Sequence, residues 1–297
     1  MKILEKRAFL INCIRIFFTD NNYLEVETPL RLPAIIPEAH IDSLTSENCF
    51  LQASPELCMK RLVSQGYDKI FQICKCFRKN ERGPKHLPEL TMLEWYAKDE
   101  NYNDLMNTCQ ALVRYIAQQL KTAGIINYQG IKIDLDRDFQ KLSVNESFLK
   151  YSDTTMEKAW DNGKFDEVMS FEIEPNLGID CPVFLYDYPA SLGSLAKLKK
   201  DNSDVAERFE FYIAGIELAN GFSELIDANE QRKRFEKELI LRKNMGKKDL
   251  PMPEKFLSDL ADMPETAGIA LGIDRLVMLF CNLPSIDQAV SFTPEEL

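Results

Sequence analysis

The sequence predicts an α+β fold in which an antiparallel β-sheet is flanked by helices. Segments with strand-like alternation come in consecutive runs, without a helical pattern between the members of each run. They lie at residues 69–78 and 89–98, and again at 183–188, 207–213 and 216–225. Consecutive strands pair as antiparallel neighbours, whereas parallel neighbours need crossover helices. Since neither a composition break nor a Gly/Ser linker divides the 297 residues, we expect one domain, 1–297.

The N-terminal half supplies helices on either side of the first strand pair. Residues 3–19 carry apolar side chains at helical spacing, and NNYLEVETP then predicts a turn and a short strand that ends at Pro29. A strand is expected at residues 50–54. The following SPELCMKRLVSQG is predicted to be a helix, because Pro55 stands where a first-turn proline is tolerated. After the strand pair, NYNDLMNTCQALVRYIAQQLK repeats apolar residues at helical spacing.

The C-terminal half returns to strands after a less regular region. We expect a small hairpin around residues 128–135, followed by helical pieces up to about residue 180. A charged helix is predicted at residues 229–245. The last element, GIALGIDRLVMLF, is predicted to run as a strand through a glycine turn into a helix.

The composition excludes several classes of protein. No apolar run is long enough to span a bilayer, and charged residues interrupt the N-terminal segment, so we expect a cytoplasmic protein with no membrane partner. The net charge is −11, and no basic block stands out, which disfavours DNA binding and makes tRNA an unlikely partner. With two histidines and eight scattered cysteines, we expect reduced thiols and no zinc site.

The common catalytic signatures are missing from the chain. It contains neither a G-x-x-x-x-G-K-[ST] phosphate loop nor a G-x-G-x-x-G after a strand. It also lacks the G-x-S-x-G elbow and the H-E-x-x-H zinc motif. Three other polar clusters are the candidates for chemistry.

The first cluster is the charged loop in FRKNERGPKHLPELTMLEWY, between the strands of the first pair. Arg78 ends a strand and begins this loop, and a planar guanidinium there can grip a phosphate with two parallel hydrogen bonds. A surface ion pair is the simpler reading of the loop alone.

The second cluster is GIELANGFSEL. Glu217 and Glu224 are seven residues apart, which puts them on opposite faces of a regular strand. A bulge at Gly221 would restore a common face, where two carboxylates and Asn220 suit Mg²⁺ and a substrate ammonium group. The alternative is a solvated strand edge.

The third cluster is GIALGIDRL. Gly268 and Gly272 would let a ligand approach the backbone closely, and Arg275 in the next helical turn could reach a triphosphate. The alternative is an ordinary helix N-terminus with Asp274 satisfying the helix dipole.

Taken together and in this order, the clusters resemble the signature motifs of class II aminoacyl-tRNA synthetases, specifically the lysyl branch. Residues 23–29 resemble motif 1, the dimer-forming segment; residues 77–96 resemble motif 2; residues 268–276 resemble motif 3. Glu217 to Glu224 matches the E-x-x-N-G-F-x-E stretch of lysyl enzymes. The resemblance implies a homodimer whose charged hairpin faces ATP.

Within that branch the chain is similar to the truncated paralogues that ligate lysine to elongation factor P. The motif 1 helix begins at once, so we expect no anticodon-binding domain. PNLG at 175–178, YPAS at 188–191 and VAERFE at 205–210 also look like those paralogues. The resemblance implies ATP-dependent activation of lysine or (R)-β-lysine as an adenylate, followed by transfer to a lysine of elongation factor P.

The resemblance also assigns roles to residues. Arg78 and Arg275 would bind phosphates, and Glu217 and Glu224 would ligate Mg²⁺. The amino acid would be held by Ser54, Pro55, Glu56, Glu94, Tyr96, Asn220, Glu224 and Ala270. ATP would be held by Arg78, Asn80, Glu81, His86, Leu87, Leu90, Glu217, Leu218, Gly272 and Arg275.

Some positions depart from the family pattern. Motif 2 usually reads Arg-x-Glu, so either Asn80 replaces the carboxylate near the adenine or Glu81 shifts into its place. Leu87 stands where the family has asparagine, and Leu90 where a phenylalanine stacks on the base. Ala270 stands where lysyl synthetases have glycine, and its methyl group is a candidate for shifting preference toward (R)-β-lysine.

Two other functions remain open from the sequence. One is an adenylate-forming enzyme with a tRNA or a small molecule as acceptor. The other is a synthetase-like regulatory subunit that binds without turnover.

Overall fold

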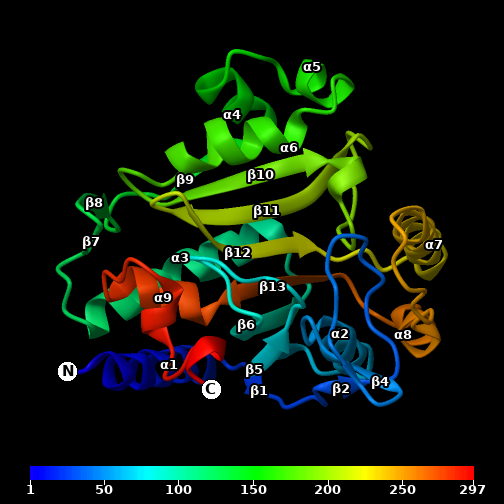
Figure 1. Ribbon diagram of the computed structural model, residues 1–297, viewed down its shortest axis with the longest axis horizontal. Coiled ribbons are helices and arrows are strands. Elements are labelled where there is room, and N and C mark those ends of the chain that lie inside the picture. The colour runs from blue at the N-terminus through cyan, green and yellow to red at the C-terminus, as the bar shows by residue number, and fades with distance from the viewer.

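The centre of the molecule is a single eight-stranded sheet, which the computed structural model describes within all 297 residues. Its order is β1-β5-β6-β13-β12-β11-β10-β9 (Figure 1). The strands are β1 (Leu24–Glu25), β5 (Lys69–Phe77), β6 (Glu89–Lys98), β9 (Gln140–Ser143), β10 (Val183–Pro189), β11 (Val205–Ile213), β12 (Ile216–Ser223) and β13 (Thr266–Gly272). The predicted α+β class is confirmed.

The antiparallel pairing expected from the sequence holds for the interior of the sheet but is wrong at both edges. β1 lies parallel to β5, and β9 lies parallel to β10. Both edge strands are short, and β9 was not predicted, because four residues without clear alternation carry little signal.

Helices cover the two faces of the sheet. On one face, α1 (Ile3–Asp20), α3 (Tyr102–Gln119) and α9 (Ile273–Phe280) share the main hydrophobic core with the sheet. On the other, α2 (Glu56–Ser64) packs on α8 (Glu254–Leu260), which also packs on α7 (Ala228–Asn244). Both chain ends lie at the lower edge of the view in Figure 1.

The remaining elements are short. Beyond β10 lie α4 (Val144–Tyr151), α5 (Met156–Asp161) and α6 (Phe165–Val168), at the top of Figure 1. A small sheet joins β2 (Arg31–Leu32), β4 (Cys49–Leu51) and β3 (Thr45–Ser46), and β7 (Ile125–Tyr128) pairs with β8 (Ile131–Asp134) as the predicted hairpin. None of the helices is long and apolar enough to cross a membrane.

Strand β12 contains a bulge, as the odd spacing of Glu217 and Glu224 led us to expect, but the bulge does not lie at Gly221. Phe211 of β11 faces Ala219, whereas the next residue, Tyr212, faces Glu217, so Leu218 is the extra residue. The placement of the bulge at Gly221 was therefore wrong. A Cβ on Gly221 would lie 2.8 Å from the Phe209 ring, so this glycine is required by packing on the core side.

Strand β13 carries large side chains on one face only. Ile269 and Leu271 are buried in the main core. The alternate residues Gly268, Ala270 and Gly272 face α2 and leave a shallow floor in the middle of the sheet, because side chains alternate along a strand.

Asp274 ties the strand-to-helix turn after β13 to two other elements. Its carboxylate pairs with Arg7 of α1 at 2.6 Å and accepts a hydrogen bond from the Thr91 backbone N–H at 2.7 Å. Asp274 is 2% exposed, so it joins α1, β6 and α9 in addition to standing in the first turn of α9.

Candidate active site

A cavity of about 690 Å³ lies over the floor formed by β12, β13 and β6, within the range of small-ligand pockets. The structure brings nearly all of the predicted site residues to its wall. Those lining it are Ser54, Glu56, Arg78, Asn80, Glu81, His86, Leu87, Leu90, Glu94, Tyr96, Glu217, Leu218, Asn220, Ala270, Gly272 and Arg275. Pro55, buried at the N-terminus of α2, and Glu224 lie behind the wall.

Register explains how three strands present polar groups to one spot. Ala270 of β13 is paired with Asn220 on one side and with Glu94 on the other. A ligand resting on Ala270 would therefore be flanked by an amide and a carboxylate about one strand spacing away on each side.

The two glycines of β13 have different reasons to be glycine. A Cβ on Gly268 would lie 2.3 Å from the Tyr96 ring and 2.4 Å from Glu224 Oε1, so no larger residue fits. A Cβ on Gly272 would meet nothing closer than Arg275 at 3.8 Å. The space at Gly272 is open cavity, and the fold does not itself demand glycine there.

Glu94 is the unpaired acid at the inner end of the cavity. Its side chain is buried, Tyr96 donates a hydrogen bond to Oε2 at 3.0 Å, and Oε1 has no partner. Burial, and then repulsion from Glu56, raises the pKa of Glu94 well above its ordinary value. A cationic ligand group would satisfy the free oxygen and lower that pKa again.

Lys60 of α2 is a fully buried cation behind the cavity wall. Its Nζ lies 2.5 Å from Glu56 Oε1 and 2.5 Å from Glu224 Oε2, and the side chain is 1% exposed. The pKa of Lys60 is raised because attraction to these two carboxylates outweighs its burial. Lys60 thus holds Glu56 at the wall and neutralises Glu224.

Asn220 is oriented by Arg208 of β11. Arg208 Nε donates to the Asn220 side-chain oxygen at 3.2 Å, and its Nη2 pairs with Glu210 at 2.7 Å. With its oxygen engaged, the Asn220 amide offers its NH₂ group as a donor to the cavity.

Arg78 stands at the outer end of the cavity. Its nearest carboxylate is Glu81 at 3.7 Å, and its buried Nε has no hydrogen-bond partner. The backbone of Asn80 adopts a left-handed φ of 65°, which folds the loop so that Glu81 approaches Arg78. Arg78 therefore retains free donors for an anion, and both Asn80 and Glu81 stay at the wall.

Arg275 bridges the charged loop and strand β12. It donates to the Lys85 carbonyl at 3.1 Å and to the Glu217 carbonyl at 2.7 Å, and Nη2 lies 2.7 Å from His86 Nε2. Burial and the charge of Arg275 lower the pKa of His86, so the ring is neutral and accepts from Arg275. Leu87, next in the loop, packs in the main core, whereas Leu90 is half-buried at the wall.

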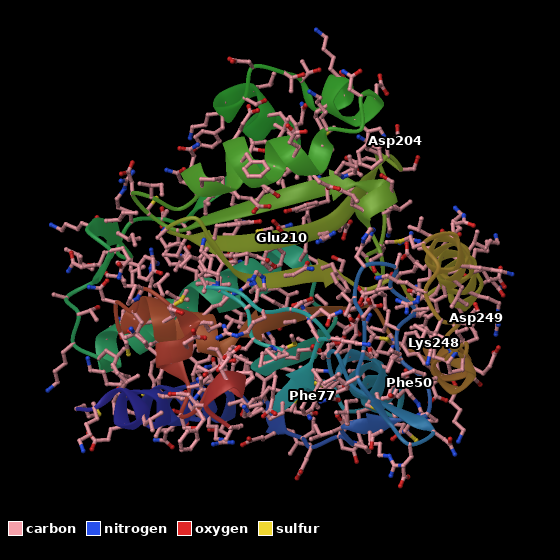
Figure 2. The ribbon with its side chains drawn as sticks, viewed as in Figure 1. Phe50, Phe77, Asp204, Glu210, Lys248 and Asp249 are labelled. Carbon is pink, nitrogen blue, oxygen red and sulfur yellow. The ribbon has the colours of Figure 1, made fainter.

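The acid near Glu217 is Glu210 on β11. Burial and repulsion from Glu210 raise the pKa of Glu217, and partial burial together with repulsion from both acids raises the pKa of Glu174 to about 7. Figure 2 labels Glu210 in the middle of the sheet and Phe77 at the end of β5, where the charged loop begins. Glu224 lies behind the wall with its Oε2 2.5 Å from Lys60, and its sharing of a metal ion with Glu217 stays a prediction.

Sequence reasoning did not single out Lys60 or Glu210. Lys60 stands on the otherwise apolar face of α2, four residues after Glu56, and that misplaced charge was the available signal. Glu210 alternates with Arg208 in VAERFE, which placed both on one face of a strand.

Comparisons with known proteins fit this geometry. Residues 1–296 match the family described as tRNA synthetases class II (D, K and N). A protein from Photobacterium profundum named elongation factor P–(R)-β-lysine ligase is 38% identical, with 98% of this chain and 95% of that protein aligned. Proteins of the same name from Pectobacterium atrosepticum and Histophilus somni are 37% and 38% identical, covering 98% and 96% of this chain and 94% and 93% of theirs.

Proposed function

The chain belongs to the class II tRNA synthetase family, and within it to the elongation factor P–(R)-β-lysine ligases, and from this premise we propose its reaction. We propose that residues 1–297 act as one catalytic domain, which activates lysine or (R)-β-lysine with ATP as an adenylate. The acyl group then passes to a lysine side chain of elongation factor P. The observation that carries the proposal is one cavity with a free acid at one end and free phosphate donors at the other.

The inner end suits a lysine-type substrate. The unpaired Glu94 oxygen, with Tyr96 beside it, accepts the distal ammonium group. The Asn220 amide donates to the carboxylate, and Glu56, held by Lys60, takes the amino group. The shallow floor at Ala270 lets the chain of the substrate lie between them.

The outer end suits the triphosphate. Arg78 binds the α-phosphate through the donors that lack partners, and its charge stabilises the pentacovalent transition state. Arg275 is held by His86 and Glu217 where it meets the terminal phosphates or the adenine. Asn80, Glu81, Leu87, Leu90, Leu218 and Gly272 complete the nucleotide wall.

The acids near the phosphates fit Mg²⁺. Glu217 lines the cavity, and Mg²⁺ prefers one or two carboxylates together with phosphate oxygens and water. Glu217, with Glu224 as the motif resemblance implies, would therefore hold the ion, which when bound neutralises the pyrophosphate leaving group.

No covalent enzyme intermediate is needed for this chemistry. The substrate carboxylate attacks the α-phosphorus, pyrophosphate leaves, and the acceptor amine then attacks the carbonyl carbon of the adenylate. The protein contributes orientation along the floor and fixed positive charge at Arg78.

The acceptor and the amino-acid isomer rest on the relatives, whose names give elongation factor P and (R)-β-lysine. The net charge of −11 also favours a protein acceptor over an RNA. Ala270 faces the middle of the substrate. We expect Ala270→Gly to shift preference toward α-lysine, and an unchanged isomer preference would contradict that role.

We also expect a cytoplasmic homodimer, as the motif 1 resemblance implies. The apolar side chains of Ile16 and Leu24 are 40% and 50% exposed near that segment, and a second copy would cover them. Light scattering coupled to gel filtration measures the state directly, and a monomer would refute it.

ATP–pyrophosphate exchange with α-lysine, (R)-β-lysine and a panel of other amino acids tests the proposal. We expect exchange with a lysine isomer alone, followed by acyl transfer to elongation factor P and not to tRNA. Folded protein that exchanges with no amino acid would instead favour a binding subunit.

A further inference from the structure

A second cavity, of about 390 Å³, adjoins the active site. The two cavities share Ile36, Glu38 and Ser194 in their walls. The second is bounded by α7 and by residues 190–198, and its rim reaches the exposed Lys237. It therefore connects the reaction cavity with the surface beside α7.

The second cavity contains a polar group with no partner. Gln231 of α7 is 1% exposed, and neither its amide oxygen nor its amide nitrogen has a hydrogen-bond partner. A buried amide without partners is unfavourable, so it points to a ligand with both a donor and an acceptor. A peptide backbone has both.

Glu38 stands at the junction of the two cavities. Its carboxylate takes part in no hydrogen bond or ion pair, although its backbone is fixed. Arg242 donates to the Glu38 carbonyl at 2.7 Å, and the next backbone N–H, that of Ala39, donates to Glu238 at 2.7 Å. Figure 1 shows the loop after β2 standing beside α7, as these contacts require.

Charged groups from four elements act on Glu38. They are Glu56 of α2, Arg78 after β5, Arg208 of β11 and Glu238 of α7. Under the proposed function, Glu56 holds the amino acid and Arg78 holds the α-phosphate. The acyl–phosphate bond would then lie between them, in the cavity whose wall also includes Glu38.

We propose that the acceptor lysine enters through this second cavity and that Glu38 is the general base that takes the proton from its ammonium group. The inference rests on the proposed function and adds the acceptor route and the base. The freed amine attacks the acyl carbon, the C–N bond forms, and the C–O bond to phosphate breaks with its electron pair leaving on AMP. One amine proton goes to Glu38 and the second leaves with the AMP phosphate.

The acid–base balance of Glu38 suits this task. Burial raises the pKa of Glu38 to about 7, Glu56 and Glu238 act in the same direction, and Arg78 and Arg208 oppose them. A base with a pKa near the working pH is most effective, and such catalysis contributes about 10²–10⁴-fold.

The test separates the two half-reactions of the full-length protein with Glu38→Gln. Pyrophosphate exchange is expected to stay within about twofold of wild type, whereas kcat for transfer to elongation factor P falls at least about 10²-fold. Hydroxylamine, an amine already neutral at pH 7, would trap the adenylate equally well in both proteins. The wild-type transfer rate should rise with pH to a plateau above an apparent pKa of about 7, whereas the rate of Glu38→Gln should keep rising above pH 8, because only the small free-amine fraction of the acceptor lysine then reacts.

Controls distinguish the base from general effects of charge and fold. Glu236→Gln removes an exposed carboxylate of α7 that lines neither cavity and should leave kcat for transfer unchanged. Glu38→Asp should recover part of the rate and restore the plateau. Gln231→Leu should raise KM for the protein acceptor about five- to tenfold without changing hydroxylamine trapping.

Several results would overturn the inference. Transfer by Glu38→Gln at the wild-type rate would show that Glu38 is not the base, and a parallel fall in exchange would place Glu38 in the adenylation site instead. An unchanged KM for the protein acceptor in Gln231→Leu would show that the acceptor does not enter through the second cavity. Absence of exchange in wild type would refute the proposed function itself, and the inference with it.

Discussion

Replacing Lys60 with methionine tests whether the buried triad behind the active site holds the fold as well as the substrate pocket. The Nζ atom lies 2.5 Å from both Glu56 and Glu224, and Lys60 and Glu224 are each 1% exposed. Methionine keeps the length and packing of the side chain but leaves the buried Glu224 and the partly buried Glu56 without a counter-charge. Breaking a buried pair in this way costs about 3–5 kcal/mol.

We therefore expect Lys60→Met to lower the free energy of unfolding by about 3–5 kcal/mol at pH 7, measured by urea unfolding with tryptophan fluorescence. Burial raises the pKa of Glu224, and the charge of Lys60 opposes that rise. Without Lys60 the pKa of Glu224 rises further, and since protonation removes the unpaired charge, the loss of stability should be smaller at pH 5 than at pH 7.

Two further variants make this result decisive. Lys60→Met combined with Glu224→Gln removes the unpaired charge of Glu224 and should recover a large part of the lost free energy of unfolding. Lys75→Met makes the same substitution in a surface pair with Glu89, about half exposed on both sides, and should cost at most about 1 kcal/mol. A loss below about 1 kcal/mol in Lys60→Met, or no recovery in the double variant, would refute the reasoning.

Three other changes have expected outcomes. Gly268→Ala forces a methyl group within 2.3 Å of the Tyr96 ring and should lower both Tm and lysine-dependent exchange, whereas Gly272→Ala should leave Tm unchanged; equal effects in differential scanning fluorimetry would contradict this. Arg275→Lys loses the forked contacts to the loop and should raise KM for ATP about tenfold in the exchange assay, with the KM for lysine as the internal control. Glu38→Gln should stabilise the fold by about 1–3 kcal/mol at pH 8 and hardly at pH 4. The pKa of Glu38 is about 7 in the folded protein and ordinarily 4.5, so the wild type loses stability as the pH rises from 4.5 to 7. Equal urea midpoints of wild type and variant at pH 8 would contradict this.

The sequence was most informative where a strand is long. β6 was predicted at residues 89–98 and lies at Glu89–Lys98, because its ten residues include Leu90, Met92, Trp95 and Tyr96 and form an almost continuously buried run. The two-residue strands β2 and β3 carry no periodic signal, and helix α8 was missed because its seven residues allow barely two turns.

The candidate site was predictable in its membership but not in its pairings. Motif resemblance collected the residues that line the cavity, yet it could not give the ion pairs among them. Those pairs depend on register, and the bulge at Leu218 together with the cross-strand neighbours decides which side chains meet. Lys60, which arrives from a helix on top of the sheet, had no counterpart in strand patterning at all.

The structure of strand β13 limits which substitutions can change the amino-acid preference of this enzyme. Its large residues fill the core and its small ones floor the cavity, so a one-residue deletion within it would carry Leu271 into the cavity and Gly268 into the core at once. Such a shift in register would damage stability and binding together, and Ala270 is the one floor residue whose side chain a substitution can still shorten. Apart from Ala270, new amino-acid preferences are therefore expected to arise from the flanking strands, at positions such as Phe222 and Tyr96.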